Sequence, residues 1–179
     1  MQKRLILDSA LLDITIRRLC QQLIENHNRF EDTVLLGLQP RGIYLARRIQ
    51  ENLQQELGKP IPTGFLDTTF HRDDFRRRDS PIRANATYID FIIEDKKVVV
   101  IDDVLFTGRT VRAAMDAMIS FGRPRKVELL VLINRKYSRD LPIEPDYVGK
   151  TVNTILSQRV LVEWKEQESE NDNIWLIDQ

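Results

Sequence analysis

The sequence predicts an α/β fold in which a central, mostly parallel β-sheet is flanked by helices. Short apolar runs recur along the chain, the clearest at residues 97–101, and such runs are typical of strands buried in a parallel sheet. Between them, apolar residues recur every three or four positions, which is the spacing of an amphipathic helix. Alternating strands and helices favour right-handed crossovers, and they place ligands at the carboxyl ends of the strands.

The amino-terminal part of the chain supplies two helices and one strand. Asp8 or Ser9 is suited to cap the first helix, because either side chain accepts a hydrogen bond from a free backbone N–H. The apolar stripe of that helix is formed by Leu12, Ile16, Leu19 and Leu23. A buried strand is expected at residues 33–38, and the turn at residues 39–42 leads into a second helix that ends at Gly58 and Pro60.

The rest of the chain continues the alternation. A strand at residues 62–70 is followed by a polar, flexible arm at about residues 71–86, which is rich in arginine and has little to bury. The strand at residues 97–101 ends on an acidic pair, and the helix after it closes at Gly122. A further strand is expected at residues 127–133, with two shorter ones near residues 160–162 and 175–177. The chain has no repeat or linker, so residues 1–179 are expected to form a single domain.

Composition restricts the classes of function. Hydrophobic residues make up 42% and charged residues 30% of the 179, which is a globular mixture with a sizeable core. Lys plus Arg and Asp plus Glu both number 27, so the formal net charge is zero. Such a balance creates no overall field that attracts nucleic acid, and any RNA binding must rest on a local basic patch. It also favours self-association.

The single cysteine and the amino-terminal residues bear on location. Cys20 excludes an intramolecular disulfide, and its apolar neighbours predict a buried, inert thiol in a reducing compartment. The apolar stretch before Asp8 is too short for export, and no segment is long enough to span a bilayer. We therefore expect a cytoplasmic protein without a membrane partner.

The strongest functional signal is the loop that follows the strand at residues 97–101. Asp102 and Asp103 end that strand, and Thr107, Gly108 and Thr110 then lead into a helix. Free backbone N–H groups, hydroxyl donors, a glycine and the positive helix end together form a cradle for a monophosphate. Each piece alone is more often an ordinary turn with a helix cap. The complete combination favours the phosphate cradle.

This run resembles the PRPP-binding signature of type I phosphoribosyltransferases, in which two acids follow an apolar strand and precede Thr-Gly-X-Thr. The continuation to Ala117, residues 37–48, and residues 141–150 resemble one branch of that family. Members of this branch are uracil phosphoribosyltransferases that in many bacteria also bind pyrimidine-operon leader RNA. The resemblance covers most of the chain and implies the family's fold, with a flexible loop and a small hood from the carboxyl-terminal part.

The resemblance also implies the roles of individual residues. Asp102 and Asp103 would bind the ribose hydroxyls, and Asp103 would act electrostatically near the developing positive charge. The 5-phosphate would be held by the loop and the helix end, over Val104, Leu105, Phe106, Thr107, Gly108, Arg109 and Thr110. Pro40, Arg41 and Gly42 match the pyrophosphate loop, where family members often hold a non-proline cis or strained peptide. Without the resemblance, residues 40–42 would be taken for a simple turn.

Other expected contacts lie on the arm and beyond the central strands. Arg83, or alternatively Arg72, would close over the pyrophosphate, although arginine runs such as residues 76–78 are usually solvated surface. Arg135 would line the pyrimidine and phosphate region, unless it is a surface residue at a strand end. Uracil would be recognised by the hood, through backbone groups between Val148 and Val162, including those of Val160. Mg²⁺ would be held mainly through PRPP, with no dedicated metal ligands.

The regulatory role depends on a basic surface. By resemblance, RNA would contact a dimer face that includes Arg17, Arg18 and Lys150. Gln21 and Glu144 stand where the family pattern has basic or histidine residues, and a carboxylate weakens phosphate binding. We therefore expect the enzymatic activity, with UMP as product and a homodimer or higher homo-oligomer, and leave leader-RNA regulation open. Two alternatives remain: a slow or non-catalytic nucleotide sensor that binds RNA, and a phosphoribosyltransferase for another base.

Overall fold

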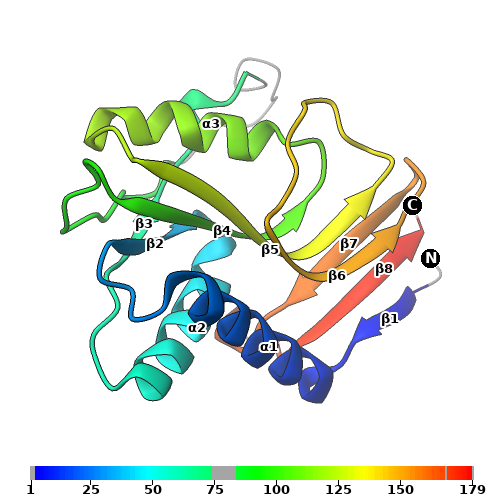
Figure 1. The fold of residues 1–179 in the computed structure, drawn as a ribbon. Helices are drawn as coiled ribbons and strands as arrows, with labels where there is room; N and C mark the ends of the chain where they lie inside the picture. Colours follow the sequence, from blue (N-terminus) through cyan, green and yellow to red (C-terminus); the bar gives the residue numbers. More distant parts are fainter. Residues whose placement is uncertain (1–2, 74–83, 168, 179) are drawn as a thin grey trace.

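The computed structural model describes residues 3–73, 84–167 and 169–178, and it contains a central parallel sheet. In these ranges the order of the strands is β3 (Thr63–Leu66), β2 (Thr33–Leu38), β4 (Lys97–Leu105), β5 (Lys126–Lys136) and β6 (Tyr147–Asn153). Every neighbouring pair in this sheet is parallel. The predicted α/β architecture, a central sheet flanked by helices, is thereby confirmed (Figure 1).

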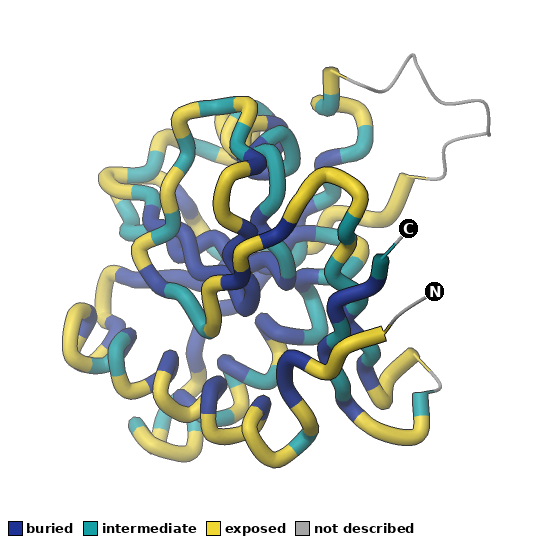
Figure 2. The backbone as a smooth tube through the Cα atoms, turned by 90° about the vertical axis from the view of Figure 1, so that its right-hand side faces the viewer, coloured by how far each residue is buried: buried dark blue, intermediate teal, exposed yellow. Residues whose placement is uncertain are grey.

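Helices cover both faces of the central sheet. α1 (Ser9–His27) and α2 (Gly42–Leu57) pack on one face, and α3 (Arg109–Met118) packs on the other (Figure 1). Side chains along β4 point alternately to the two faces of the sheet. Val99 and Ile101 therefore join the core with α1 and α2, whereas Val98 and Val100 join the core with α3. Figure 2 shows the buried strands passing through the middle of the molecule, with exposed segments around them.

A smaller antiparallel sheet, here called the hood, stands beside the central sheet. Its order is β1 (Lys3–Leu7), β8 (Asn173–Asp178) and β7 (Gln158–Glu163). The sequence predicted β7 and β8, but β1 and β6 were not expected as strands. The hood therefore includes the amino-terminal strand as well as the carboxyl-terminal part. Arg48 of α2 holds it in place, because its guanidinium donates hydrogen bonds to Glu166 and Asp172 and lies 4.7 Å from the centre of the Trp164 ring.

The ends of several elements follow from local sequence. The Asp8 carboxylate caps α1 by accepting a hydrogen bond from the N–H of Leu11 at 2.9 Å. Gly58 ends α2 in a left-handed conformation (φ 63°), as predicted. β4 continues past its predicted end and includes Asp102 and Asp103. Short 3-10 turns occur at Thr69–His71, Ile119–Phe121 and Lys165–Gln167, so the strand expected at residues 62–70 is confined to β3.

Two further expectations concern Cys20 and membranes. The Cys20 side chain is buried in the core between α1 and α2, and burial raises the pKa of its thiol to about 12. A buried, unreactive thiol was predicted, and the position of Cys20 confirms the burial. Across the described ranges, the helices are all too short or too polar to cross a bilayer.

Candidate active site

The loops that the sequence singled out lie side by side at the carboxyl ends of β2 and β4. β2 ends at Leu38, and residues 39–41 connect it to α2. β4 is followed by residues 106–108, here called the phosphate loop, which lead into α3. Because β2 and β4 are adjacent and parallel, with Gly37 paired with Ile101, both loops leave the sheet at the same edge.

The acidic pair at the end of β4 is buried. The Asp102 carboxylate accepts a hydrogen bond from the N–H of Asp103 at 2.9 Å, and both residues are less than 10% exposed. Burial, together with the negative charge of Asp103, raises the pKa of Asp102 well above the usual carboxyl range. Two carboxylates held this close favour a ligand that brings hydroxyl donors or a cation to them.

Arg41 connects this acidic pair to the hood. Its Nε donates a hydrogen bond to the Asp103 carboxylate at 3.0 Å, and its Nη2 donates to the carbonyl of Val162 in β7. The Arg41 side chain as a whole is 38% exposed. Arg41 belongs to the predicted pyrophosphate loop, and it therefore places a positive charge beside the Asp103 carboxylate.

Gly42 allows α2 to begin close against β4. A Cβ at this position would lie 2.6 Å from the carbonyl oxygen of Ile101 and 3.1 Å from the Cα of Asp102, which are clashing distances. In the described ranges, the cis peptide bond lies between Gln39 and Pro40. The family pattern led us to expect a non-proline cis or strained peptide in this loop, so the observed cis bond differs from it in being an X-Pro bond.

The phosphate loop has the backbone shape expected of an anion cradle. Gly108 adopts a left-handed conformation (φ 91°, ψ −4°), and α3 begins at the next residue. The Thr107 hydroxyl accepts a weak hydrogen bond from the N–H of Arg109 at 3.4 Å. The exposed N–H groups at the start of α3 are therefore directed out of this loop.

The side chains just before the loop serve the fold. Val104 packs against the core with α1 and α2, and Leu105 is buried in the core with α3. Only their backbone atoms are available to a ligand. The ring of Phe106 lies under the Arg135 guanidinium, with 3.8 Å between the guanidinium carbon and the ring centre. In the predicted PRPP-binding stretch, the side chains of Val104 and Leu105 therefore belong to the core, and the phosphate loop that follows is the part available to a ligand.

Two arginines border the phosphate loop, with different partners. Arg109 forms ion pairs with Asp73 and, at 3.2 Å, with Asp140, so its side chain is engaged by carboxylates. Arg72, at the base of the arm, donates to the Thr110 hydroxyl at 3.4 Å. Arg72 therefore reaches the predicted phosphate cradle. Arg83, the other arm residue predicted to contact PRPP, lies outside the described residues.

Arg135 is a buried strand-end residue rather than a surface one. It is 5% exposed, and it donates hydrogen bonds to the Thr154 hydroxyl at 3.0 Å and to the carbonyl of Gln158 at 2.7 Å. Together with its contact on Phe106, these bonds join the phosphate loop to Thr154, just after β6, and to Gln158, the first residue of β7. Sequence reasoning did not identify Thr154 or Gln158, because their contacts with Arg135 cross about 20 residues of chain and leave no local pattern.

The structure does not bring Val148 to Arg135. Arg135 pairs with Val152 along β6, and Val148 pairs with Val131. Val148 therefore lies about 13 Å away along the strand, at the usual rise per residue. The Val160 side chain packs against the core with α1 and α2. Thr154 and Gln158 are closer to the carboxyl edge where the predicted site residues meet.

The three residues predicted to bind RNA lie around α1 and β6. Arg18 donates to the carbonyl oxygens of Val148, at 3.3 and 3.4 Å, and Gly149, at 2.5 Å. Lys150 donates to the carbonyl of Ile6 at 3.2 Å. Arg17 pairs with Asp13 one turn earlier on α1. Arg18 and Lys150 are thus held by carbonyl oxygens and pair with no carboxylate among the residues that the structure describes, whereas Arg17 is balanced by Asp13.

The acidic pair also fits a magnesium ion that arrives with its substrate. No cluster of at least three His, Cys, Asp or Glu side chains that could hold a metal occurs within the described ranges. Asp102 and Asp103 offer carboxylate oxygens, the hard ligands that Mg²⁺ prefers. Since Mg²⁺ usually takes few protein ligands beside substrate phosphates, this pair suffices for such an ion.

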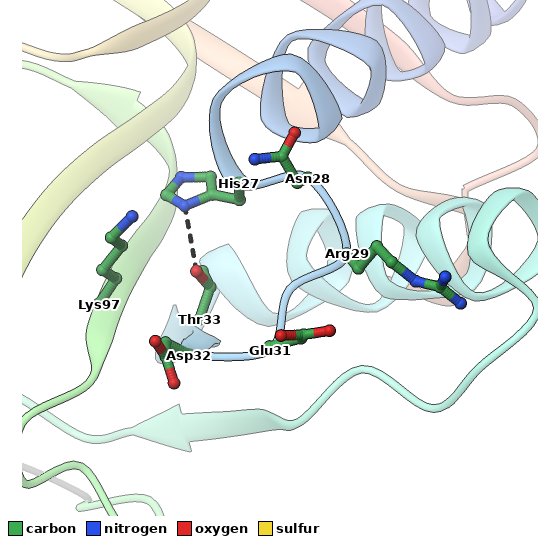
Figure 3. Close-up of a pocket in the computed structure, with 7 residues that line it drawn as sticks. All are labelled: His27, Asn28, Arg29, Glu31, Asp32, Thr33 and Lys97. Carbon is green, nitrogen blue, oxygen red and sulfur yellow. Dashed lines mark hydrogen bonds between the residues drawn. The ribbon is translucent and has the colours of Figure 1, made fainter.

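A second polar site lies at the opposite ends of the strands. His27, at the end of α1, lies 2.7 Å from the Glu128 carboxylate and 3.0 Å from the Thr33 hydroxyl, and Tyr147 donates to Glu128 at 2.8 Å. Figure 3 shows His27 and Thr33 lining a pocket with Lys97 beside them. Since these side chains satisfy one another, the site joins α1 to β2, β5 and β6 and serves the fold.

Comparison with known proteins agrees with this geometry. The model of the phosphoribosyl transferase domain matches residues 5–167. A hypoxanthine phosphoribosyltransferase of Trypanosoma cruzi has the same fold, with a TM-score of 0.72 at 14% identity, over 98% of this chain and 96% of that one. The chain belongs to the phosphoribosyltransferase family.

Its curated relatives define the branch within that family. The bifunctional protein PyrR of Caldicellulosiruptor bescii is 44% identical over 97% of this chain and 94% of its own length. The bifunctional protein PyrR of Enterococcus faecalis is 40% identical over 94% of this chain and 93% of its own. The branch is that of PyrR, as the resemblance of the motifs implied.

Proposed function

We propose that this protein transfers the phosphoribosyl group of PRPP to uracil, which yields UMP and pyrophosphate. One observation carries the proposal: the buried pair Asp102 and Asp103 lies between a glycine-containing phosphate loop and Arg41 at a single edge of the sheet. This arrangement offers separate partners for the phosphate, the ribose and the pyrophosphate of one substrate. Membership of the PyrR branch supports uracil as the base.

The residues suggest how PRPP is held. The N–H groups of the phosphate loop and of the start of α3 bind the 5-phosphate, together with the hydroxyls of Thr107 and Thr110. The ribose 2- and 3-hydroxyls donate hydrogen bonds to Asp102 and Asp103. Residues 40–42 bind the pyrophosphate, and Arg72, which donates to the Thr110 hydroxyl, adds positive charge beside the 5-phosphate. A bound Mg²⁺ supplies positive charge to the pyrophosphate oxygens and the ribose.

Catalysis then consists mainly of positioning and electrostatics. The bond from the anomeric carbon to the pyrophosphate oxygen breaks as the bond to the uracil nitrogen forms, positive charge develops on the ribose, and the proton on that nitrogen is released to water. Asp103 stabilises that charge without forming a bond to it, and Arg41 stabilises the departing pyrophosphate. Because Arg41 holds both Asp103 and the hood, it couples the leaving-group side to the base side.

The first test is pyrophosphate release from PRPP and Mg²⁺, with uracil compared with orotate, hypoxanthine and guanine. We expect release that depends on uracil and that falls steeply in Asp103→Asn. Asp116→Asn is the matched control, because Asp116 is half-exposed near the end of α3 and pairs with Arg112. Release with another base would support the alternative of a different specificity. No release, with UMP still raising the melting temperature, would support a nucleotide sensor.

A second function, UMP-responsive binding of pyrimidine-operon leader RNA, is favoured by the surface around α1 and β6. Arg18 and Lys150 are held there by backbone carbonyls, and within the described ranges neither forms an ion pair with a carboxylate. In filter binding, UMP should tighten the complex and salt should weaken it. Lys150→Ala should lower RNA affinity, and Lys59→Ala, a control on the loop after α2, should not. Equal affinity in all three proteins would exclude this surface.

The same proposal includes a homodimer or higher homo-oligomer. Met115, Ile119 and Phe121 are exposed on and just after α3, at 46%, 72% and 44%. Apolar side chains gathered in this way are typical of a contact surface. Sedimentation velocity on the purified protein measures the oligomeric state directly, and Ile119→Asp should shift it toward monomer. A monomeric wild type would refute this part of the proposal.

A further inference from the structure

Residues 139–141, in the connection between β5 and β6, bond to the carbonyl side of the phosphate loop. The guanidinium Nη1 of Arg139 donates to the carbonyl oxygen of Phe106. The N–H groups of Asp140 and Leu141 both donate to the carbonyl oxygen of Thr107, at 3.0 and 3.2 Å. Two consecutive carbonyls of the loop are therefore fixed by a segment more than 30 residues away along the chain.

Peptide geometry gives these bonds a consequence for the opposite side of the loop. In a trans peptide the C=O and the following N–H point in opposite directions, and both peptides concerned are trans. When residues 139–141 hold the carbonyls of Phe106 and Thr107, the N–H groups of Thr107 and Gly108 must point away from that segment. These are donors that a phosphate at this loop would require.

From this geometry we infer that residues 139–141 are a positioning brace, which fixes the N–H groups of the phosphate loop toward the 5-phosphate of PRPP. This inference rests on the proposed function and adds a residue to it. Arg139 touches the loop from behind and is a positioning residue, with no contact of its own to substrate. Without the brace, the peptides would be free to rotate, and the donors would lose their common direction.

The brace is itself anchored on both sides. Arg139 Nη2 donates to the side-chain oxygen of Asn134 in β5 at 2.7 Å, so the guanidinium spans from the sheet to the loop. Ile143 packs against the core with α3, and the space beside Gly108 is filled by Leu141 and Ile143. Gly108 thus abuts the brace directly, since an added Cβ would lie 3.5 Å from the Cβ of Leu141.

The brace also holds the Arg109 side chain. Asp140 accepts a hydrogen bond from Arg109 Nε at 3.2 Å, and Asp73 pairs with the same guanidinium. An anion in the loop is then bound by backbone and hydroxyl donors more than by this arginine. The affinity for the phosphate therefore depends mainly on the direction of the N–H groups, which Arg139 helps to fix.

The test separates the two ends of PRPP by titration calorimetry with ribose 5-phosphate and, independently, with magnesium pyrophosphate. Arg139→Ala should weaken ribose 5-phosphate binding by about 10- to 100-fold, the usual effect of losing a charged hydrogen bond. Binding of pyrophosphate should be unchanged, because residues 40–42 do not touch the brace. Guanidinium ion, added well below denaturing concentrations, should restore part of the lost affinity. Arg125→Ala, at the other end of β5, is the matched control.

Each outcome decides the inference. Unchanged ribose 5-phosphate affinity in Arg139→Ala would overturn it, and so would an equal loss for both ligands that guanidinium does not rescue, because that pattern indicates general damage. If Arg139→Ala does not fold, Arg139→Lys keeps the charge and one donor and should show a smaller, selective loss. A wild type that binds ribose 5-phosphate but releases no pyrophosphate with any base would refute the proposed function and leave the brace standing.

Discussion

At the scale of single residues, the site depends on one carboxylate whose ionisation is opposed by its surroundings and on one glycine whose missing Cβ leaves room for a close contact. Asp102 is a carboxylate placed where burial and a like charge both oppose ionisation. Gly42 is a helix residue whose missing Cβ lets the start of α2 touch the end of β4. The sequence indicated both positions, since an acidic pair after a buried strand and a glycine after a turn are local patterns. Neither pattern revealed the contact between them.

Replacement of Gly42 by Ala should damage the site more than the fold. The added methyl would collide with the carbonyl of Ile101 and displace Asp102, and a displacement of about 1 Å can cost roughly 100-fold in rate. Steady-state kinetics should therefore show kcat/KM for PRPP reduced by about that factor. Gly58→Ala, at the other end of α2, faces open space and should cost about 1 kcal/mol of stability without changing kcat/KM.

The buried Asp102 should make stability depend on pH. Its pKa in the folded protein is raised above the unfolded value of about 4, so the folded state binds the proton more tightly. Stability should then fall as pH rises from about 4 through the raised pKa. Asp102→Asn replaces the ionisable carboxyl and so removes this loss of stability. It should raise the melting temperature at pH 8 by about 2–4 °C for each kcal/mol of folding stability regained. The gain should shrink toward pH 4. A gain independent of pH would contradict the assignment.

At the scale of elements, the connections between strands and helices are made by polar networks that no local pattern encodes. His27, Glu128 and Tyr147 come from α1, β5 and β6, and they meet at the amino ends of the strands (Figure 3 shows His27). Arg135 and Arg139 do the same at the carboxyl ends. Hydrophobic spacing predicted the elements themselves, because it reflects burial. Hydrophobic spacing does not indicate which polar side chain forms a hydrogen bond with which other element.

Removal of the Tyr147 hydroxyl tests the network at the amino ends. This hydroxyl donates to Glu128 at 2.8 Å and lies 3.1 Å from both His27 and Asn26. Tyr147→Phe should lower the free energy of unfolding by about 1–3 kcal/mol, because it leaves buried partners unsatisfied. Urea denaturation measures this change. Tyr137→Phe, at an 84% exposed position, should change stability by less than about 0.5 kcal/mol.

At the scale of the whole molecule, most strands of the central sheet were predictable, whereas its edge strand β6 and part of the hood were not. Residues 98–101 are apolar without interruption, so β4 and its parallel neighbours follow from the sequence. β1 was missed because Lys3 and Arg4 resemble a charged flank, and its partner strand β8 lies at the other end of the chain. β6 was missed because it mixes Gly149, Lys150 and Thr151 among its apolar residues. Pairing with a distant segment therefore forms β1, and β6 forms as the edge strand beside β5 despite its mixed composition.

Deletion of residues 1–7 should therefore loosen the hood and spare the central sheet. β8 would lose its pairing with β1 and keep only that with β7. Hydrogen exchange of backbone amides in β8 should accelerate, and exchange in β2 and β4 should stay unchanged. Acceleration throughout the central sheet would show that the two sheets unfold as one unit, contrary to this expectation.

The buried thiol of Cys20 has a practical consequence for studying these movements. With its pKa near 12, hardly any of this thiol is ionised at neutral pH, and its side chain is sealed in the core. Maleimide reagents attack ionised, accessible thiols, so the native protein should remain unlabelled. A cysteine introduced at an exposed position such as Tyr137 would then carry a fluorophore or spin label alone, without first removing the natural one.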